Sequence, residues 1–265
     1  MSVPSGKKFN LKELKNKDYL ILLKFLNGDN FKGFYETLDK LIIKSIPSFN
    51  ELDLCDKLYI YLTYYYYSVN NSFLMKDTSY NDIEIDISVL LNELETKYDK
   101  ELSSIKFHNW NAFAHYPKNI LFDDYNIISI DYLSSLKKIE NVEITLENIK
   151  DIRDFIDTKS LNEIEYEISK KFSFEIVFFS LKERKISEWL LTPNIFYAVA
   201  YIYKDLLENF YMLQYILTHY IKIEWSSVLE MTPLETTILY KNFVEDKEKQ
   251  TADEAISEAT SNLYF

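Results

Sequence analysis

The chain has 265 residues, of which 47% are hydrophobic, and its net charge is −12 at pH 7. That length is enough to bury a substantial core. Three glycines are too few for the tight turns of a β-sandwich or β-barrel, and the acidic charge without a basic stripe argues against a nucleic-acid partner. The single cysteine, Cys55, excludes an internal disulfide and a cysteine-based zinc site.

Residues 1–78 predict a helical unit. Apolar residues recur at spacings of three and four, which predicts helices over 16–27, 31–45 and 54–69. We expect Asn16 to cap the first helix, Gly28 to end it, and Pro47 to end the second. The tyrosine run 64–67 in the third helix is interpreted as core plus rim rather than as a ligand site.

Residues 79–145 predict a small mixed α/β module. The polar stretch 70–81 before it is expected to be mainly loop. Alternating isoleucines over 83–87 predict a half-exposed strand, and Ser88 is expected to cap a short helix. Further strands are predicted at 105–110, 119–122 and 142–144, with a helix over 131–139.

Residues 146–250 predict a hairpin and a helical C-terminal unit. Thr145 is expected to begin a helix, and Ser160 begins a Ser-x-x-Glu capping box for the next one. Dense apolar residues over 174–179 and 186–191 predict a β-hairpin. A long apolar helix from Thr192 to Tyr220 follows, with Thr192 as its cap; being apolar on most sides, it is expected to be the buried spine of the fold.

Two further capping boxes follow the long helix. Ser227-Val228-Leu229-Glu230 and Thr232-Pro233-Leu234-Glu235 both have the Ser/Thr-x-x-Glu form, and the second begins the last helix. The sequence becomes polar after Glu245, so 246–262 is expected to be solvated or disordered, within a polar tail, 251–265. The predicted class is α+β and predominantly α-helical, with helical N-terminal and C-terminal units around the mixed module.

The sequence contains no recognisable catalytic or metal-binding pattern. His108, His115 and His219 have no ligand-like spacing, and Cys55 is expected to be buried and inert. We therefore predict a protein that is not an enzyme and has no cofactor and no metal. No signal peptide is expected, and charges within the long helix, such as Lys204, argue against membrane insertion.

Three segments resemble the baseplate hub proteins of T4-like contractile-tailed bacteriophages. The first runs from Pro4 to Val69 and includes Asp18-Tyr19-Leu20 and Asp56-Lys57-Leu58. The second is Asn209-Phe210-Tyr211 with the apolar residues up to His219. The third, Trp225 to Tyr240, resembles the family's Glu-x-Met-x-Pro-Trp-Glu-Arg signature, through residues Glu230, Met231, Pro233, Glu235, Ile238 and Tyr240.

The chain departs from the family pattern at three places. Leu234 stands where the family usually has tryptophan, and Thr236 stands where it usually has arginine. Some members have a Cys-x-x-Cys in the region matching 174–190, and this chain does not. These differences bear on the local partner contacts and on any metal.

The resemblance implies a non-enzymatic structural or assembly component of the tail baseplate hub, made in the host cytoplasm and located in the virion. Its partners would be other hub or tail proteins, or copies of itself. Two alternatives stay open: a tail-assembly chaperone absent from the mature particle, and a host-directed enzyme with a site near His108 and His115. The predicted interaction residues are Trp225, Glu230, Met231, Pro233, Leu234, Glu235 and Tyr240.

Overall fold

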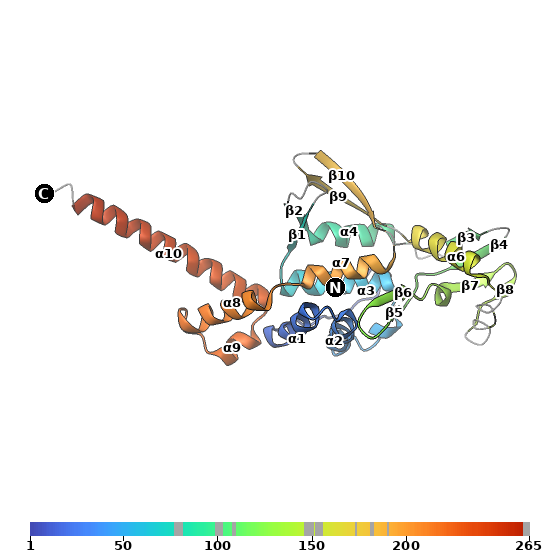
Figure 1. Ribbon diagram of the computed structural model, residues 1–265, viewed down its shortest axis with the longest axis horizontal. Coiled ribbons are helices and arrows are strands. Elements are labelled where there is room, and N and C mark those ends of the chain that lie inside the picture. The colour runs from blue at the N-terminus through green and yellow to red at the C-terminus, as the bar shows by residue number, and fades with distance from the viewer. Residues whose placement is uncertain are drawn as a thin grey trace.

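The computed structural model describes residues 1–76, 82–98, 103–107, 110–145, 151, 156–172, 174–180, 183–189 and 191–261 (Figure 1). Helices predominate, and the described strands form small antiparallel sheets. The predicted class, α+β and predominantly α-helical, is therefore confirmed. The division of the sequence into four units stays a prediction.

The N-terminal helices have the predicted order. They are α1 (Asn16–Asn27), α2 (Phe31–Ile43) and α3 (Leu54–Ser68), with a 3₁₀ turn, η1 (Phe49–Glu51), between the last two. Asn30 caps α2 by accepting from the Gly33 amide, and Asp53 caps α3 by accepting from the Asp56 amide. The prediction that Asn16 caps α1 is wrong, because its side-chain amide donates instead to a carbonyl in the C-terminal unit.

The predicted single helix from Thr192 to Tyr220 is wrong, because the chain forms two helices there. They are α7 (Pro193–Tyr203) and α8 (Leu207–His219). The break has a local cause: Asp205 Oδ1 accepts from the Leu206 amide at 2.7 Å and from Asn209 Nδ2 at 3.0 Å. An aspartate that binds its own neighbours offers the backbone an alternative to the helix. Thr192 makes no capping hydrogen bond, so that prediction is also wrong.

Helix α1 supplies donors to the carbonyls at this break. The Tyr19 hydroxyl donates to the Tyr203 carbonyl at 3.0 Å, and Asn27 Nδ2 donates to the Asp205 carbonyl at 2.9 Å. Carbonyls that lose their helical partner need another donor when they are shielded from water. The break is therefore stabilised by side chains from the other end of the sequence.

Only α7 has the central position that was expected of the whole long helix. It packs against α1, α2 and α3 (Figure 1). The Tyr35 hydroxyl on α2 donates to the Phe196 carbonyl of α7 at 2.6 Å, and the rings of Phe34 and Tyr203 meet edge to face at 5.4 Å. In the tyrosine run, Tyr64 is buried and Tyr67 is exposed, which agrees with core plus rim.

A β-hairpin follows α3. Strands β1 (Ser72–Lys76) and β2 (Asp82–Asp86) pair antiparallel and lead into α4 (Ile87–Lys97). The expectation of loop is wrong for 72–76, where Phe73 pairs across the hairpin with Ile85. Helix α4 begins before Ser88; its cap is Asp86, whose Oδ1 accepts from the Ser88 amide.

The mixed module is mainly sheet. Strands β3 (Ser103–Phe107), β4 (Trp110–Ala114), β7 (Leu136–Ile139) and β8 (Val142–Glu143) form one sheet in that order, and β5 (Ile120–Phe122) pairs with β6 (Ile127–Ile130). The predicted helix over 131–139 is wrong, since only η2 (Leu133–Ser135) is helical and β7 follows. Leu136 and Ile139 are both buried although they lie three residues apart, because the pairing of β7 with β4 shifts in register, so that Leu136 pairs with Ala114 and Ile139 pairs with Ala112.

The predicted β-hairpin before α7 is confirmed. Helix α6 (Thr158–Lys171) precedes it, and β9 (Phe174–Ser180) pairs antiparallel with β10 (Glu183–Trp189). Helix α6 begins before Ser160, because Asp157 caps it by accepting from the Ser160 amide at 2.7 Å. The helix expected to begin at Thr145 lies mostly outside the described residues.

Two helices complete the chain, α9 (Trp225–Glu230) and α10 (Pro233–Ser261), and α10 projects from the body (Figure 1). The prediction that Ser227 caps a helix is wrong, because α9 already begins at Trp225. Of the two expectations for 246–262, disorder is wrong, since α10 continues to Ser261, whereas exposure to solvent agrees with the side chains over 246–251. The lysine, glutamate and glutamine there favour helix. The apolar tip 263–265 lies outside the described residues.

Candidate protein-interaction surface

The corner between α9 and α10 is fixed by a capping box. The Glu235 amide donates to Thr232 Oγ1 at 3.1 Å, and the Thr232 amide donates to Glu235 Oε2 at 2.7 Å. Each side chain thus satisfies the other residue's free backbone N–H. Pro233, the first residue of α10, is buried. The predicted capping box at Thr232 is confirmed, and it determines the direction in which α10 leaves the corner.

Helix α1 holds the same corner from the other side. The Asn16 amide donates to the Met231 carbonyl, and Asn16 Nδ2 donates to the Val228 carbonyl, both at 2.8 Å. Lys17 Nζ lies 2.5 Å from Glu230 Oε1. This pair raises the pKa of Lys17 through its hydrogen bond to Glu230. Because Asn16 is fully buried, its two bonds fix the corner to the N-terminal helices.

The predicted interaction residues differ in their exposure. Trp225 is 44% exposed, whereas Met231, Leu234 and Tyr240 are half-buried. Pro233 is buried, so it contributes to the fold of the corner and not to a contact with a partner. The exposed carboxylates of Glu230 and Glu235 already have partners within the chain, Lys17 and the Thr232 amide. Among the apolar and aromatic residues of the predicted set, Trp225 is the most exposed.

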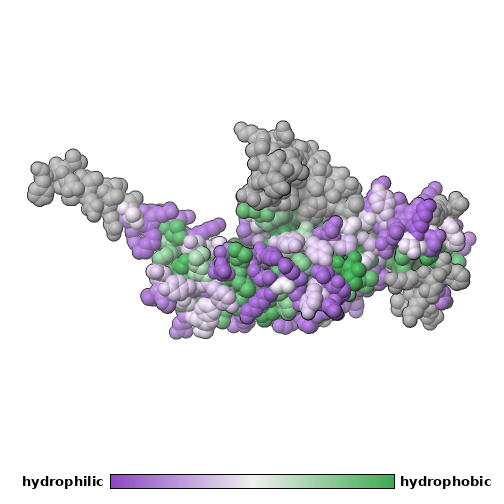
Figure 2. All heavy atoms as spheres, in the orientation of Figure 1, coloured by the Kyte–Doolittle hydropathy of each residue, from purple (hydrophilic) through white to green (hydrophobic). Residues whose placement is uncertain are grey.

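A second group of aromatic residues, most of them exposed, lies beside this corner. Tyr215 stacks on His219 with 4.3 Å between ring centroids, and Tyr220 lies 6.2 Å from both Tyr215 and Phe243 of α10. We call these four residues the aromatic surface. Tyr215 and Tyr220 are half or more exposed. Apolar residues also lie among hydrophilic ones over the α8–α10 unit (Figure 2).

The apolar pattern of 192–220 predicts one buried helix, so it does not predict an exposed aromatic surface in this region. The buried residues of α8 are Phe210, Gln214 and Leu217. Tyr211 and Tyr215 lie on a different side of the helix, four residues apart, and both are exposed. Division of the apolar residues of 207–219 into two faces was the signal that could have found them.

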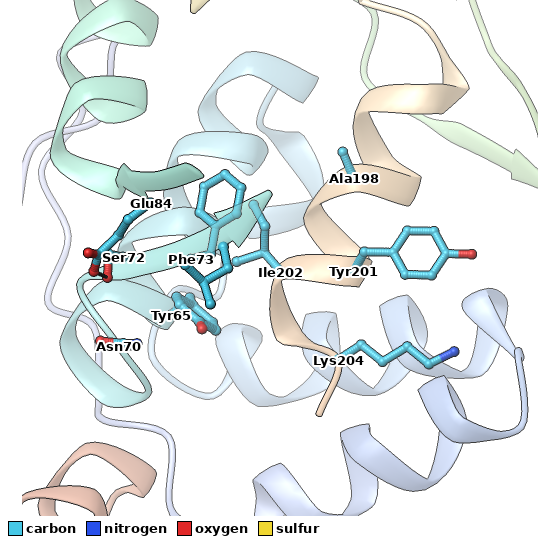
Figure 3. A pocket seen from close by; sticks show the side chains of 10 residues that line it. Tyr65, Asn70, Ser72, Phe73, Glu84, Ala198, Tyr201, Ile202 and Lys204 are labelled. Atoms are coloured by element: carbon cyan, nitrogen blue, oxygen red, sulfur yellow. Dashed lines mark hydrogen bonds between the residues drawn. The ribbon is translucent and has the colours of Figure 1, made fainter. Parts of the chain in front are cut away.

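A groove of about 710 Å³ separates α7 from the β1–β2 hairpin (Figure 3). Phe73 and Ile202 lie at its centre, and Ser72 Oγ donates to Glu84 Oε1 on the hairpin side. Across α7, Lys204 is already paired with Asp29 at 3.0 Å. The groove is therefore lined by both polar and apolar residues, and its charged groups Glu84 and Lys204 already have partners. For this reason the α9–α10 corner is the better candidate for a recognition site.

The described residues contain no group of three or more His, Cys, Asp or Glu side chains close enough to hold a metal ion. The absence of a metal stays a prediction. Cys55 is buried, and burial raises the pKa of its thiol well above the usual value, which disfavours the reactive thiolate. None of the described helices is both long and apolar enough to span a membrane.

Comparison of the chain with protein-family models, with characterised proteins and with solved structures finds no match.

Proposed function

We propose that this protein is a non-enzymatic structural or assembly component of the baseplate hub of a contractile phage tail, acting through protein–protein contacts. The observation that supports this most is the α9–α10 corner. The residues resembling the hub signature, Glu230, Met231, Pro233 and Glu235, lie in a corner fixed by hydrogen bonds. The corner also presents Trp225 to solvent.

A rigid, exposed corner suits recognition of another protein. Because the capping box and Asn16 already fix the backbone, little conformational entropy is lost there on binding. Tryptophan, tyrosine and methionine are enriched at the centres of protein interfaces. Trp225 and the aromatic surface supply these residue types on neighbouring helices. The proposed partners are other hub or tail proteins, or copies of this chain.

Mass spectrometry of purified tails tests the role directly. A structural component is expected in the tails at a fixed ratio to other baseplate proteins. A tail-assembly chaperone, the alternative role, would bind tail proteins during assembly and be absent from purified tails. If the chain neither enters tails nor binds any tail protein during assembly, the proposal is wrong in both forms.

Surface variants test the site. Trp225→Ser and Tyr215→Ser are expected to reduce incorporation into tails by about tenfold or more, as for residues central to an interface, without changing the circular dichroism spectrum. Tyr166→Ser is the matched control, since Tyr166 is exposed on α6 in another part of the chain. Incorporation equal to wild type in both corner variants would show that the corner is not the contact surface.

A further inference from the structure

A polar pocket of about 330 Å³ lies at the N-terminal end of α3, away from the α9–α10 corner. Five stretches of the chain form its walls: the lead-in before α1, the beginning of α3, the end of α4, the loop after β4, and the η2–β7 turn. The charged and histidine side chains that line it are Lys7, Glu51, Asp53, Asp56, His115, Lys118 and Lys137.

The carboxylates beside α3 are already engaged. Asp53 Oδ1 accepts from the Asp56 amide at 2.9 Å, and its Oδ2 accepts from the Tyr98 hydroxyl at 2.7 Å. Asp56 Oδ1 accepts from the Ser5 amide at 3.0 Å. Burial raises the pKa of Asp53 above its usual value. Asp53 and Asp56 therefore bind groups in the walls of the pocket. Of the three carboxylates that line the pocket, only that of Glu51 is exposed.

The lysine, histidine and serine side chains that line the pocket differ from these two acids in their partners. Among the described residues, no carboxylate lies within ion-pair distance of the ammonium groups of Lys7, Lys118 or Lys137. Burial lowers the pKa of His115, and the positive charges of Lys137 and Lys118 lower it further. The Ser5 hydroxyl oxygen is buried and has no hydrogen-bond partner in the described part of the chain.

We propose that this pocket binds the phosphate group of a small molecule. Lysine ammonium groups on three separate segments, with the Ser5 hydroxyl and His115, supply donors from several directions, as a tetrahedral oxyanion with several acceptors requires. The volume is at the lower end of the usual range for ligand pockets, so it suits free phosphate or a sugar phosphate. This site is independent of the proposed role in a tail.

Histidine NMR with inorganic phosphate tests the proposal on the full chain. A bound phosphate dianion adjacent to His115 stabilises its protonated form, so the pKa of His115 is expected to rise when millimolar phosphate is added. His219, which lies on α8 outside the pocket, is the internal reference, and its NMR signals are expected not to respond to phosphate. A comparison of inorganic phosphate with ribose 5-phosphate by calorimetry shows whether the free anion or an ester binds more tightly.

Two neighbouring lysines provide a matched pair of variants. Lys137→Gln is expected to weaken phosphate binding by about tenfold, the effect of losing one charge-assisted contact. Lys138→Gln, one residue along β7 and outside the pocket lining, is expected to bind as the wild type does. The proposal is overturned if phosphate leaves the titration of His115 unchanged, shifts His115 and His219 equally, or binds both variants with the same affinity.

Discussion

The Tyr203 hydroxyl donates a hydrogen bond to the backbone carbonyl of Tyr61, with 2.5 Å between the two oxygens. This bond joins the last residue of α7 to the middle of α3 inside the core. Both side chains are almost completely buried, and burial raises the pKa of Tyr203 well above its usual value. A buried hydroxyl without a partner would be costly, so this contact helps to specify where α7 lies.

Substitution of Tyr203 by phenylalanine tests that contact. Tyr203→Phe keeps the ring and removes the hydroxyl, so it is expected to lower the free energy of unfolding by about 1 kcal/mol. Tyr201→Phe is the control, because Tyr201 is exposed on the same helix. Urea denaturation measures both. Equal stability of Tyr203→Phe and wild type would contradict a stabilising role for the bond.

Substitution by alanine is expected to affect stability differently at the two candidate helix caps of the C-terminal unit, Thr232 and Ser227. Thr232→Ala removes the side chain that accepts from the Glu235 amide and is expected to cost about 1 kcal/mol of stability. Ser227→Ala is expected to be nearly neutral, because Ser227 lies inside α9 and is exposed. Thermal denaturation followed at 222 nm compares them. A larger loss for Ser227→Ala than for Thr232→Ala would contradict the observed capping.

Gly33 and Gly28 differ in the space that is available to an added side chain. A Cβ added at Gly33 on α2 would lie 2.5 Å from Phe25 Cε1, whereas one at Gly28 would have its nearest neighbour at 3.5 Å. Gly33→Ala is therefore expected to destabilise the protein by about 1–2 kcal/mol through overpacking. Gly28→Ala is expected to be neutral or slightly stabilising, since its φ of −94° suits alanine. Denaturant midpoints give the comparison, and the opposite order would show that Phe25 moves aside freely.

The titration of Asp39 makes the free energy of unfolding depend on pH. Burial raises its pKa to about 6, although its Oδ1 accepts a hydrogen bond from the Tyr61 hydroxyl at 2.6 Å. Because the folded pKa is raised, the folded state holds this proton more tightly than the unfolded state does. The resulting stability is complete below the unfolded pKa, near 4, and is lost as the pH rises through about 6.

Asp39→Asn removes this titration and keeps an oxygen that can accept from Tyr61. Relative to wild type, its free energy of unfolding is expected to rise by about 2 kcal/mol between about pH 4.5 and about pH 7.5. Urea denaturation at both pH values measures this difference. Asp124→Asn is the control, since Asp124 is exposed in the loop between β5 and β6. A difference between Asp39→Asn and wild type that does not change with pH would contradict the raised pKa.

Periodicity in the sequence predicted the elements whose burial pattern is strong and local. The helices over 16–27, 31–45 and 54–69 and the β9–β10 hairpin all occur. Where tertiary contacts or competing short-range hydrogen bonds decide the local structure, periodicity in the sequence does not predict it. Asp205 breaks the long apolar helix through bonds to its neighbours, and the side chain of Asn16 is used by α9, which lies more than 200 residues later.

The capping patterns show the same limit. Thr232 and Ser227 have the same Thr/Ser-x-x-Glu spacing, yet only Thr232 caps a helix. The difference is that Pro233 fixes where α10 begins, while α9 begins two residues before Ser227. For the candidate site, the resemblance located the corner, but exposure depends on packing. The sequence could not show that Pro233 is buried or that Tyr215 faces solvent.

The length of α10 sets a distance between the body and anything held at its far end. With 29 residues, the helix is about 43 Å long, and the part from Asp246 to Ser261 accounts for about 24 Å. A helix resists bending over such a length far better than a flexible linker of the same number of residues. A partner attached near Ser261 would therefore be held at a nearly constant separation, so α10 would act as a spacer whose length changes by about 1.5 Å for each residue inserted or removed.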